Sequence, residues 1–186
     1  TMTIQEMGGL RKTIEEGIKR IHLMLPEINQ LERSPQSVEH LSLALQCGGS
    51  DAWSGITSNP ALGHAADLLV KKGGTAVLAE FYGSEHLLTR RAINKTVGDK
   101  LVDRILWWED YVSRNKGSLN KNPSPGNKAG GLTTILEKSL GAAAKGGTTP
   151  LNDVRLYAEK AKSKGFLFMD SPGYDPASVT GQIATG

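Results

Sequence analysis

The chain has 186 residues, of which 38% are hydrophobic and 22% charged, and its formal net charge at pH 7 is +3. Such a length and composition are typical of a soluble globular domain with a substantial core, and the few scattered positive charges and sparse aromatic residues argue against a nucleic-acid partner. No apolar run approaches the roughly 18 residues of a membrane span, no signal peptide is expected, and the lone Cys47 can neither close an internal disulfide nor hold an iron–sulfur cluster unaided. We therefore expect a cytoplasmic protein with no membrane partner.

The first predicted element is an amphipathic helix over residues 4–24, because apolar residues recur there at spacings of three and four. Gly8 and Gly9 weaken its first turn, so its well-formed part is expected to begin near Leu10. Pro26 is expected to end or bend the helix. The polar segment 29–39 reads as a connection.

A strand, a glycine turn, a helix and a second strand follow in this order. The short apolar run 40–46 predicts a buried strand, and the run 75–80 predicts the next one. Between them, Asn59 is a candidate N-cap with Pro60 at the first helical position, and the helix is expected to end near Lys72. This order indicates a βαβ unit with parallel neighbouring strands.

The remaining elements continue the alternation of helices and strands. Residues 132–144 predict a helix anchored by an apolar face that includes Leu136 and Leu140. The other expected elements are a short helix near 85–91, a long amphipathic helix over about 97–112, an extended segment at 151–157, a strand at 165–170 and a short helix at 177–185. The fold class predicted is α/β, with Rossmann-like βαβ units, a mostly parallel sheet and glycine-rich loops at the C-terminal ends of strands.

Two glycine-rich loops stand out. Residues 122–131 contain two prolines and three glycines and lead into a helix, and residues 46–51 repeat this character earlier in the chain. Such loops bring backbone N–H groups close to a ligand, and the positive end of the following helix favours an anion there. An ordinary connecting loop explains the same residues about as well.

Reactive groups follow three of the predicted strands: Cys47 and Asp51, then Glu80, then Asp170 and Asp175. The residues that could act with them are His86, Asn127, Lys128, Lys145 and Tyr174. Carboxylates and a lysine near glycine loops suit the removal of a proton next to a carboxylate, followed by loss of a hydroxyl. The alternatives are structural: Cys47 as a packed apolar residue, Asp51 and Asp175 in Asx turns, and His86 as a surface residue.

Several familiar motifs are absent from the sequence. It contains no GxxxxGK[ST] phosphate loop, no GxGxxG dinucleotide fingerprint, no GxSxG elbow and no HExxH zinc motif.

The sequence resembles the altronate/galactarate dehydratase family from about Gly8 to its end. Six blocks carry the resemblance: 46–51 (QCGGSD), 59–63 (NPALG), 66–70 (ADLLV), 86–92 (HLLTRRA), 122–131 (NPSPGNKAGG) and 170–176 (DSPGYDP). Family members typically have a separate small N-terminal domain and extend further. The resemblance thus implies that residues 1–186 form a single α/β domain, part of the catalytic region of a longer protein, with a subdivision near 115–125 left open.

The resemblance implies a hydro-lyase that dehydrates a six-carbon sugar acid, of the altronate or galactarate type, to a 2-keto-3-deoxy acid. The reaction would proceed by metal-assisted abstraction of the α-proton and loss of the C3 hydroxyl, with iron(II) or manganese as the divalent metal. Two alternatives stay open. One is a C–S lyase like the large subunit of sulfolactate sulfo-lyase, and the other is an inactive fragment that serves only in binding or assembly.

The predicted site combines the strand ends with the glycine loops. The catalytic candidates are Cys47, Asp51, Glu80, His86 and Lys128, and the substrate-binding candidates are Gly48, Gly49, Ser50, Asn127, Gly130 and Gly131. No metal ligands are assigned. The expected partner is a small-molecule sugar acid, and a homodimer is conceivable if apolar faces are exposed.

Overall fold

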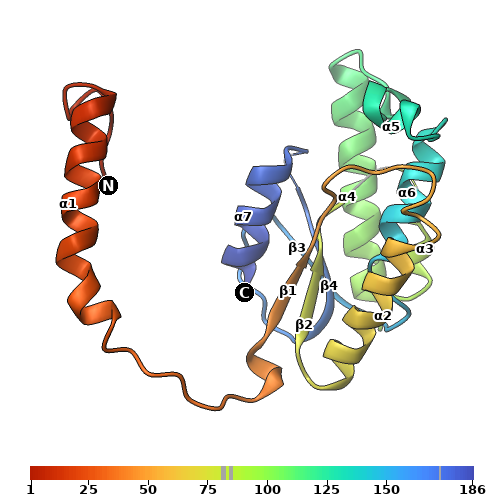
Figure 1. The fold of residues 1–186 in the computed structure, drawn as a ribbon. Coiled ribbons are helices and arrows are strands. Elements are labelled where there is room, and N and C mark those ends of the chain that lie inside the picture. Colours follow the sequence, from red (N-terminus) through yellow and green to blue (C-terminus); the bar gives the residue numbers. More distant parts are fainter. Residues whose placement is uncertain (81–82, 84–85, 172) are drawn as a thin grey trace. The chain divides into compact units, whose positions relative to one another are not determined.

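The computed structural model describes residues 1–80, 83, 86–171 and 173–186 (Figure 1). The chain divides into two compact units, Thr1–Gln36 and Ser37–Gly186. The boundary between the units lies within the segment predicted as a connection.

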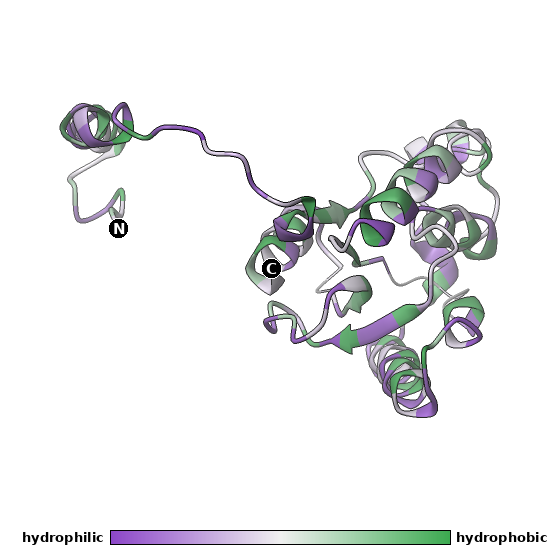
Figure 2. Ribbon diagram, turned by 90° about the horizontal axis from the view of Figure 1, so that it is seen from below, coloured by the Kyte–Doolittle hydropathy of each residue, from purple (hydrophilic) through white to green (hydrophobic). Residues whose placement is uncertain are grey.

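The first unit is built around helix α1, Leu10–Ile28. It begins at Leu10 as predicted, but it continues two residues past Pro26, so the proline does not end it. No residue of α1 is buried, and Ile14, Ile18 and Ile21 are each more than half exposed. Figure 2 shows both hydrophobic and hydrophilic residues around this helix.

The second unit contains a four-stranded parallel sheet. The strands are β1 (Ser42–Leu45), β2 (Thr75–Leu78), β3 (Leu151–Arg155) and β4 (Gly165–Met169), in the spatial order β1-β2-β4-β3. All three strand pairs are parallel. The structure therefore confirms the predicted α/β class and parallel sheet. The C-terminal ends of all four strands meet at one edge, where open α/β sheets place their ligands.

Helices flank this sheet on both sides (Figure 1). The helices of this unit are α2 (Ser58–Lys71), α3 (His86–Thr89), α4 (Lys95–Arg114), α5 (Pro125–Ala129), α6 (Ile135–Ala144) and α7 (Asp175–Thr185), with short 3-10 turns at Val38–His40 and Leu119–Lys121. None of the helices in the described part of the chain combines the length and apolar character needed to cross a membrane.

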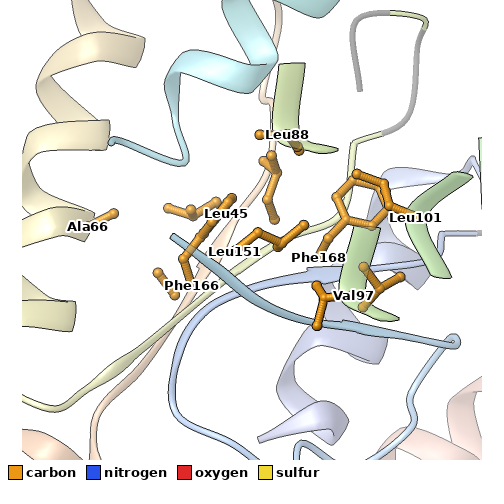
Figure 3. Packing of buried hydrophobic residues seen from close by; sticks show 11 residues of the cluster. Leu45, Ala66, Leu88, Val97, Leu101, Leu151, Phe166 and Phe168 are labelled. Carbon is orange, nitrogen blue, oxygen red and sulfur yellow. The ribbon is translucent and has the colours of Figure 1, made fainter. Parts of the chain in front are cut away.

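The core lies on both faces of the sheet. Alternate strand residues such as Leu45, Phe166 and Phe168 point toward Ala66 of α2 and Leu101 of α4, forming the larger cluster (Figure 3). The opposite face carries the smaller cluster, Val77, Ala79, Leu167 and Met169. Side chains of α7 reach this second face: Gln182 donates to the backbone carbonyls of Leu45 and Val77, and Thr185 contacts the Met169 sulfur. Period-two alternation thus gives both faces of each strand a partner.

Two local predictions for the helices were wrong. Asn59 does not cap α2: it lies inside the helix, and its buried amide donates to the Gly141 carbonyl of α6 at 3.0 Å. Helix α6 does not bury its leucines either, because Leu136 and Leu140 are 50% and 46% exposed. It buries a small, polar face instead, made of Lys138, Ser139, Gly141 and Ala142. This face is the one that the backbone of α2 and its preceding turn can approach closely.

Asp67 of α2 stabilises the turn that follows α6. Its carboxylate accepts hydrogen bonds from the Thr148 N–H at 2.8 Å, the Thr148 hydroxyl at 2.8 Å and the Thr149 N–H at 3.0 Å. Burial alone would raise the pKa of Asp67, but these hydrogen bonds outweigh it and hold the pKa below its ordinary value of 3.8.

We expect Asp67→Ala to lower the free energy of unfolding by about 2 kcal/mol at pH 7, because three donors lose a charged acceptor. The stabilisation from a lowered carboxyl pKa is present above the unfolded-state value and is lost as the pH falls through the folded-state value. Denaturant unfolding at pH 7 and at about pH 3 should therefore show a smaller difference at the acid pH. An equal loss at both values would assign the effect to packing.

Candidate active site

The candidate site lies at the C-terminal edge of the sheet. Strand β1 leads into the glycine loop at 46–50, β2 leads to Glu80, and β4 leads to Asp170. The Gln46 amide donates to Asp175 Oδ1 at 2.9 Å, which ties the β1 loop to the start of α7. Asp170 does not join this contact: it accepts from Trp108 Nε1 of α4 at 2.8 Å.

A buried ion pair forms the centre of this edge. Lys145, at the end of α6, donates from Nζ to Glu80 Oε1, and both side chains are at most 4% exposed. Within the described residues, Glu80 Oε2 has no hydrogen-bond partner. Burial raises the pKa of Glu80 above its ordinary value, Lys145 and Lys138 oppose this rise, and Asp175 adds to it. The carboxyl group therefore binds a proton more readily than an exposed glutamate does.

The two glycine loops are in direct contact. Asn127 donates from Nδ2 to the Ser50 carbonyl at 2.8 Å, and the Ala52 N–H donates to the Gly130 carbonyl at 3.0 Å. A Cβ atom on Gly130 would lie 2.7 Å from the Cβ atom of Asp51, so only glycine allows this approach. The sequence gives the two loops a similar glycine-rich character, and the structure places them side by side.

Asn127 connects the glycine loops to α6. Its Oδ1 accepts from the Ser124 N–H at 2.9 Å, which completes a capping box around α5, and from Lys138 Nζ at 3.0 Å. The side chain is buried, so its hydrogen bonds hold one arrangement of the loop at 46–51. Asn127 was predicted to bind substrate, whereas in the structure its amide is occupied by these contacts.

A pocket of about 310 Å³ opens beside the first glycine loop. Its lining consists of Gln46, Cys47, Gly48, Gly49, Ser50, Ser54, Ser58, Asn59, Leu62 and Lys145. Lys145 is the one residue among these that carries a formal charge. Hydroxyl and amide groups supply most of the remaining polar atoms, so the pocket offers hydrogen bonds to a small polar molecule and an ammonium group to an anion.

The predicted catalytic residues do not all reach this pocket. Cys47 lines it, and Glu80 lies behind Lys145. Asp51 accepts from the Ser54 N–H at 2.6 Å, which is the turn-closing role considered as its structural alternative. His86 on α3 and Lys128 on α5 are both exposed, and neither lines the pocket.

Two buried lysines belong to α6 and its end: Lys138 was absent from the prediction, and Lys145 was named beside the strand-end groups but not among the catalytic candidates. Lys138 and Lys145 are seven residues apart, which places them on the same side of a helix two turns apart. Both are buried, although lysine is rarely buried unless it is paired. The sequence signal for this burial was the spacing of the two lysines among small residues. A solvent-facing side of a helix would carry more charged residues.

The described donor atoms do not form a divalent-metal site by themselves. Within residues 1–80, 83, 86–171 and 173–186, no three or more His, Cys, Asp or Glu side chains cluster as metal ligands would. A metal bound by three such side chains would need at least one of them from outside the described residues. Metal dependence therefore stays a prediction.

We expect Asn127→Ala to lower the free energy of unfolding by about 2 kcal/mol, since the partly buried Ser50 carbonyl and Ser124 N–H lose their side-chain partner. The amides of residues 46–51 should also exchange with solvent faster in the variant. Hydrogen exchange measured by mass spectrometry checks both. Asn115→Ala, which removes an exposed amide at the end of α4, is the control and should leave the loop unchanged.

Comparison with known proteins assigns this chain to a family. A family model for the C-terminal region of D-galactarate/altronate dehydratases matches residues 38–186. Galactarate dehydratase (L-threo-forming) of Escherichia coli is 37% identical over 181 residues, which cover 96% of this chain and 35% of the relative. Altronate dehydratase of Bacillus subtilis is 40% identical over 170 residues, covering 88% of this chain and 34% of the relative.

A third relative carries a different name. The (2R)-sulfolactate sulfo-lyase subunit beta of Chromohalobacter salexigens is 33% identical over 187 residues, covering 97% of this chain and 48% of the relative. The chain thus spans about a third of the length of the two dehydratases and about half of this subunit. Because the family model covers most of the chain, the chain belongs to the D-galactarate/altronate dehydratase family and corresponds to its C-terminal region.

Proposed function

We propose that the protein is a sugar-acid dehydratase that removes water from a six-carbon aldonate or aldarate to give a 2-keto-3-deoxy acid. The observation that carries this proposal is the pocket at the C-terminal edge of the sheet, in which Lys145 is accompanied by hydroxyl and amide groups. The names of the two dehydratase relatives support the substrate class.

The chemistry of the lining suits a sugar acid. A carboxylate forms charge-assisted hydrogen bonds with an ammonium group, and these are stronger than bonds between neutral partners. Ser50, Ser54 and Ser58 supply hydroxyl groups to the lining. The Ser54 and Ser58 hydroxyls donate to the carbonyls of Asp51 and Ser54, which leaves their lone pairs to accept from substrate hydroxyls, while the Ser50 hydroxyl can donate as well as accept. The exposed backbone of Gly48 and Gly49 leaves room for a close approach, because nothing lies within 4 Å of a Cβ atom built on either residue.

A second candidate function is the elimination of sulfite from a sulfonated hydroxy acid. The similarity to the sulfo-lyase subunit favours it. A 2-hydroxy-3-sulfonate shares the carboxylate and C2 hydroxyl of a sugar acid but has fewer hydroxyls. The three serines of the pocket favour the polyhydroxylated substrate.

The test is turnover by the whole protein with altronate, galactarate and sulfolactate, anaerobically, with iron(II), manganese or no added metal. Keto acid from a sugar acid would support the dehydratase and name its substrate, and the metal series tests the predicted divalent ion. Sulfite from sulfolactate, without keto acid from either sugar acid, would replace the proposal with the sulfo-lyase. The same assay on residues 1–186 alone tests whether this region has turnover by itself or serves only in binding or assembly.

A cytoplasmic location and a homodimer complete the proposal. The exposed apolar residues of α1 support association, because an amphipathic helix normally buries its apolar side. Sedimentation of the whole protein measures the oligomeric state.

A further inference from the structure

We propose that Lys145 is the catalytic acid–base of this site and that Glu80 is the positioning residue that holds its mobile proton. The inference rests on the proposed elimination at C2 and C3 of a 2-hydroxy acid. It assigns a role to a buried lysine that the sequence analysis named beside the strand-end groups but left out of the catalytic candidates.

Lys145 lies between the pocket and the carboxylate of Glu80. The residue lines the pocket next to the 46–50 loop, and its Nζ also donates to Glu80 Oε1. Glu80 itself is not part of the pocket lining. A substrate in the pocket would therefore meet the amino group, with the carboxyl group behind it.

The environment of Glu80 allows its carboxyl group to hold a proton. Burial raises the pKa of its carboxyl group, and Oε2 has no hydrogen-bond partner within the described residues. Transfer of one proton along the hydrogen bond, from Nζ to Oε1, converts the ion pair into a neutral amine and a neutral acid. A low-dielectric environment disfavours separated charges, so the two forms are brought closer in free energy there. A buried lysine in the amine form is an established type of general base.

The protons and electrons of the elimination balance without another reactant. The amine of Lys145 takes the C2 proton, and the electron pair of the C2–H bond enters the enediolate of the carboxylate. The enediolate then expels the C3 oxygen with the C3–O electron pair, and the Lys145 ammonium gives the same proton to that oxygen, which leaves as water. The enol product tautomerises to the 2-keto acid, and the Lys145–Glu80 pair returns to its starting charge.

Lys138 is a less suitable candidate although it is buried on the same helix. Its Nζ donates to Asn127 Oδ1 at 3.0 Å, and it does not line the pocket. Its position supports the loop at 46–51 through Asn127. Helix α6 therefore supplies one lysine to the pocket and one to the loop contact.

The experiment measures exchange of the C2 hydrogen in the whole protein. The probe is the 3-deoxy analogue of the sugar acid that the protein dehydrates, which can lose its C2 proton but has no C3 hydroxyl to expel. The wild-type protein in D2O should replace the C2 hydrogen with deuterium, as followed by NMR. If the protein is instead a sulfo-lyase, lactate is the matching probe, since it lacks the sulfonate.

Two variants and a control distinguish the basicity of the Lys145 amine from its positive charge and from an effect on folding. Lys145→Arg keeps the positive charge without a ready base, and the double variant Glu80→Met/Lys145→Met removes the pair without leaving a buried charge unpaired. Both should slow exchange and turnover by about 10²–10⁴-fold, the usual contribution of a general acid–base group. Lys71→Met, at an exposed lysine of α2, should behave as the wild type.

Three results would overturn the inference. Turnover by Lys145→Arg within a few-fold of wild type would mean that charge alone is required. Continued C2 exchange by the double variant, with its fold confirmed by circular dichroism, would place the base elsewhere. Turnover of a sugar acid by the wild type without exchange of its 3-deoxy analogue would remove the C2-proton step from Lys145, whereas no turnover of any sugar acid would count against the dehydratase proposal itself.

Discussion

Gly63→Ala is expected to destabilise the second unit by about 3 kcal/mol or more. Gly63 lies in α2 where this helix meets the end of α6. A Cβ atom there would be 2.1 Å from the Ala144 carbonyl oxygen, 2.9 Å from the Gly147 nitrogen and 3.0 Å from the Gly147 Cα. These atoms are backbone, so a rotamer change cannot relieve the overlap, and the helices must move apart. Denaturant unfolding, followed by tryptophan fluorescence, measures the loss.

Gly98→Ala is the matched control in another helix. The closest atom to its Cβ would be the Ala92 Cβ at 3.6 Å, an ordinary van der Waals contact. Since alanine is the better helix former, this variant should gain about 0.5–1 kcal/mol. If Gly63→Ala were as stable as Gly98→Ala, the close packing of α2 on the end of α6 would be wrong. Lys145 directly follows α6, so the same displacement should also reduce activity in the whole protein.

The sequence predicted the parallel sheet well because its signals are local. Short apolar runs next to glycines identified β1, β2 and β4, and β3 lies within the segment predicted to be extended. The contact between the two glycine loops could be suspected from their shared composition. Its geometry, with Asn127 bonded to the Ser50 carbonyl 77 residues away, depends on long-range packing that periodicity does not encode.

The two wrong predictions for the helices also came from long-range packing that periodicity does not encode. Asn59 looked like an N-cap because it precedes Pro60, but its amide was satisfied by Gly141 on another helix. In α6 the leucines suggested the buried side of the helix. The side that is buried contains Gly141 and Ala142, which allow a closer backbone approach. Lys138 lies on this side, and Lys145, directly after the helix, is buried as well. Choosing between two candidate faces of one helix requires knowing its neighbour. Lys138 was therefore missed, and Lys145 was named without being placed on the buried side.

The second large effect is expected from the Glu80–Lys145 pair. Lys145→Met should lower the free energy of unfolding at pH 7 by about 3–5 kcal/mol, because it leaves the carboxyl group of Glu80 buried without its cation. The double variant Glu80→Met/Lys145→Met should recover most of this loss, since two apolar side chains of similar volume replace the pair. Denaturant unfolding of the four proteins in the double-mutant cycle gives the coupling energy. A double variant as unstable as Lys145→Met would mean that packing, and not charge, sets the cost.

The pH dependence of the free energy of unfolding in this double-mutant cycle identifies the group responsible for the cost of Lys145→Met. Burial raises the folded-state pKa of Glu80 above its ordinary value of 4.5, so the native state holds a proton that the unfolded state releases between the two values. The stability contributed by this proton is complete below the unfolded pKa and is lost as the pH rises through the folded pKa. Lys145 opposes the shift, and its removal extends the window upward. The cost of Lys145→Met should therefore be small near pH 4 and grow toward pH 8, while the double variant should show no such slope. A cost that stays constant across this range would exclude Glu80 as its source.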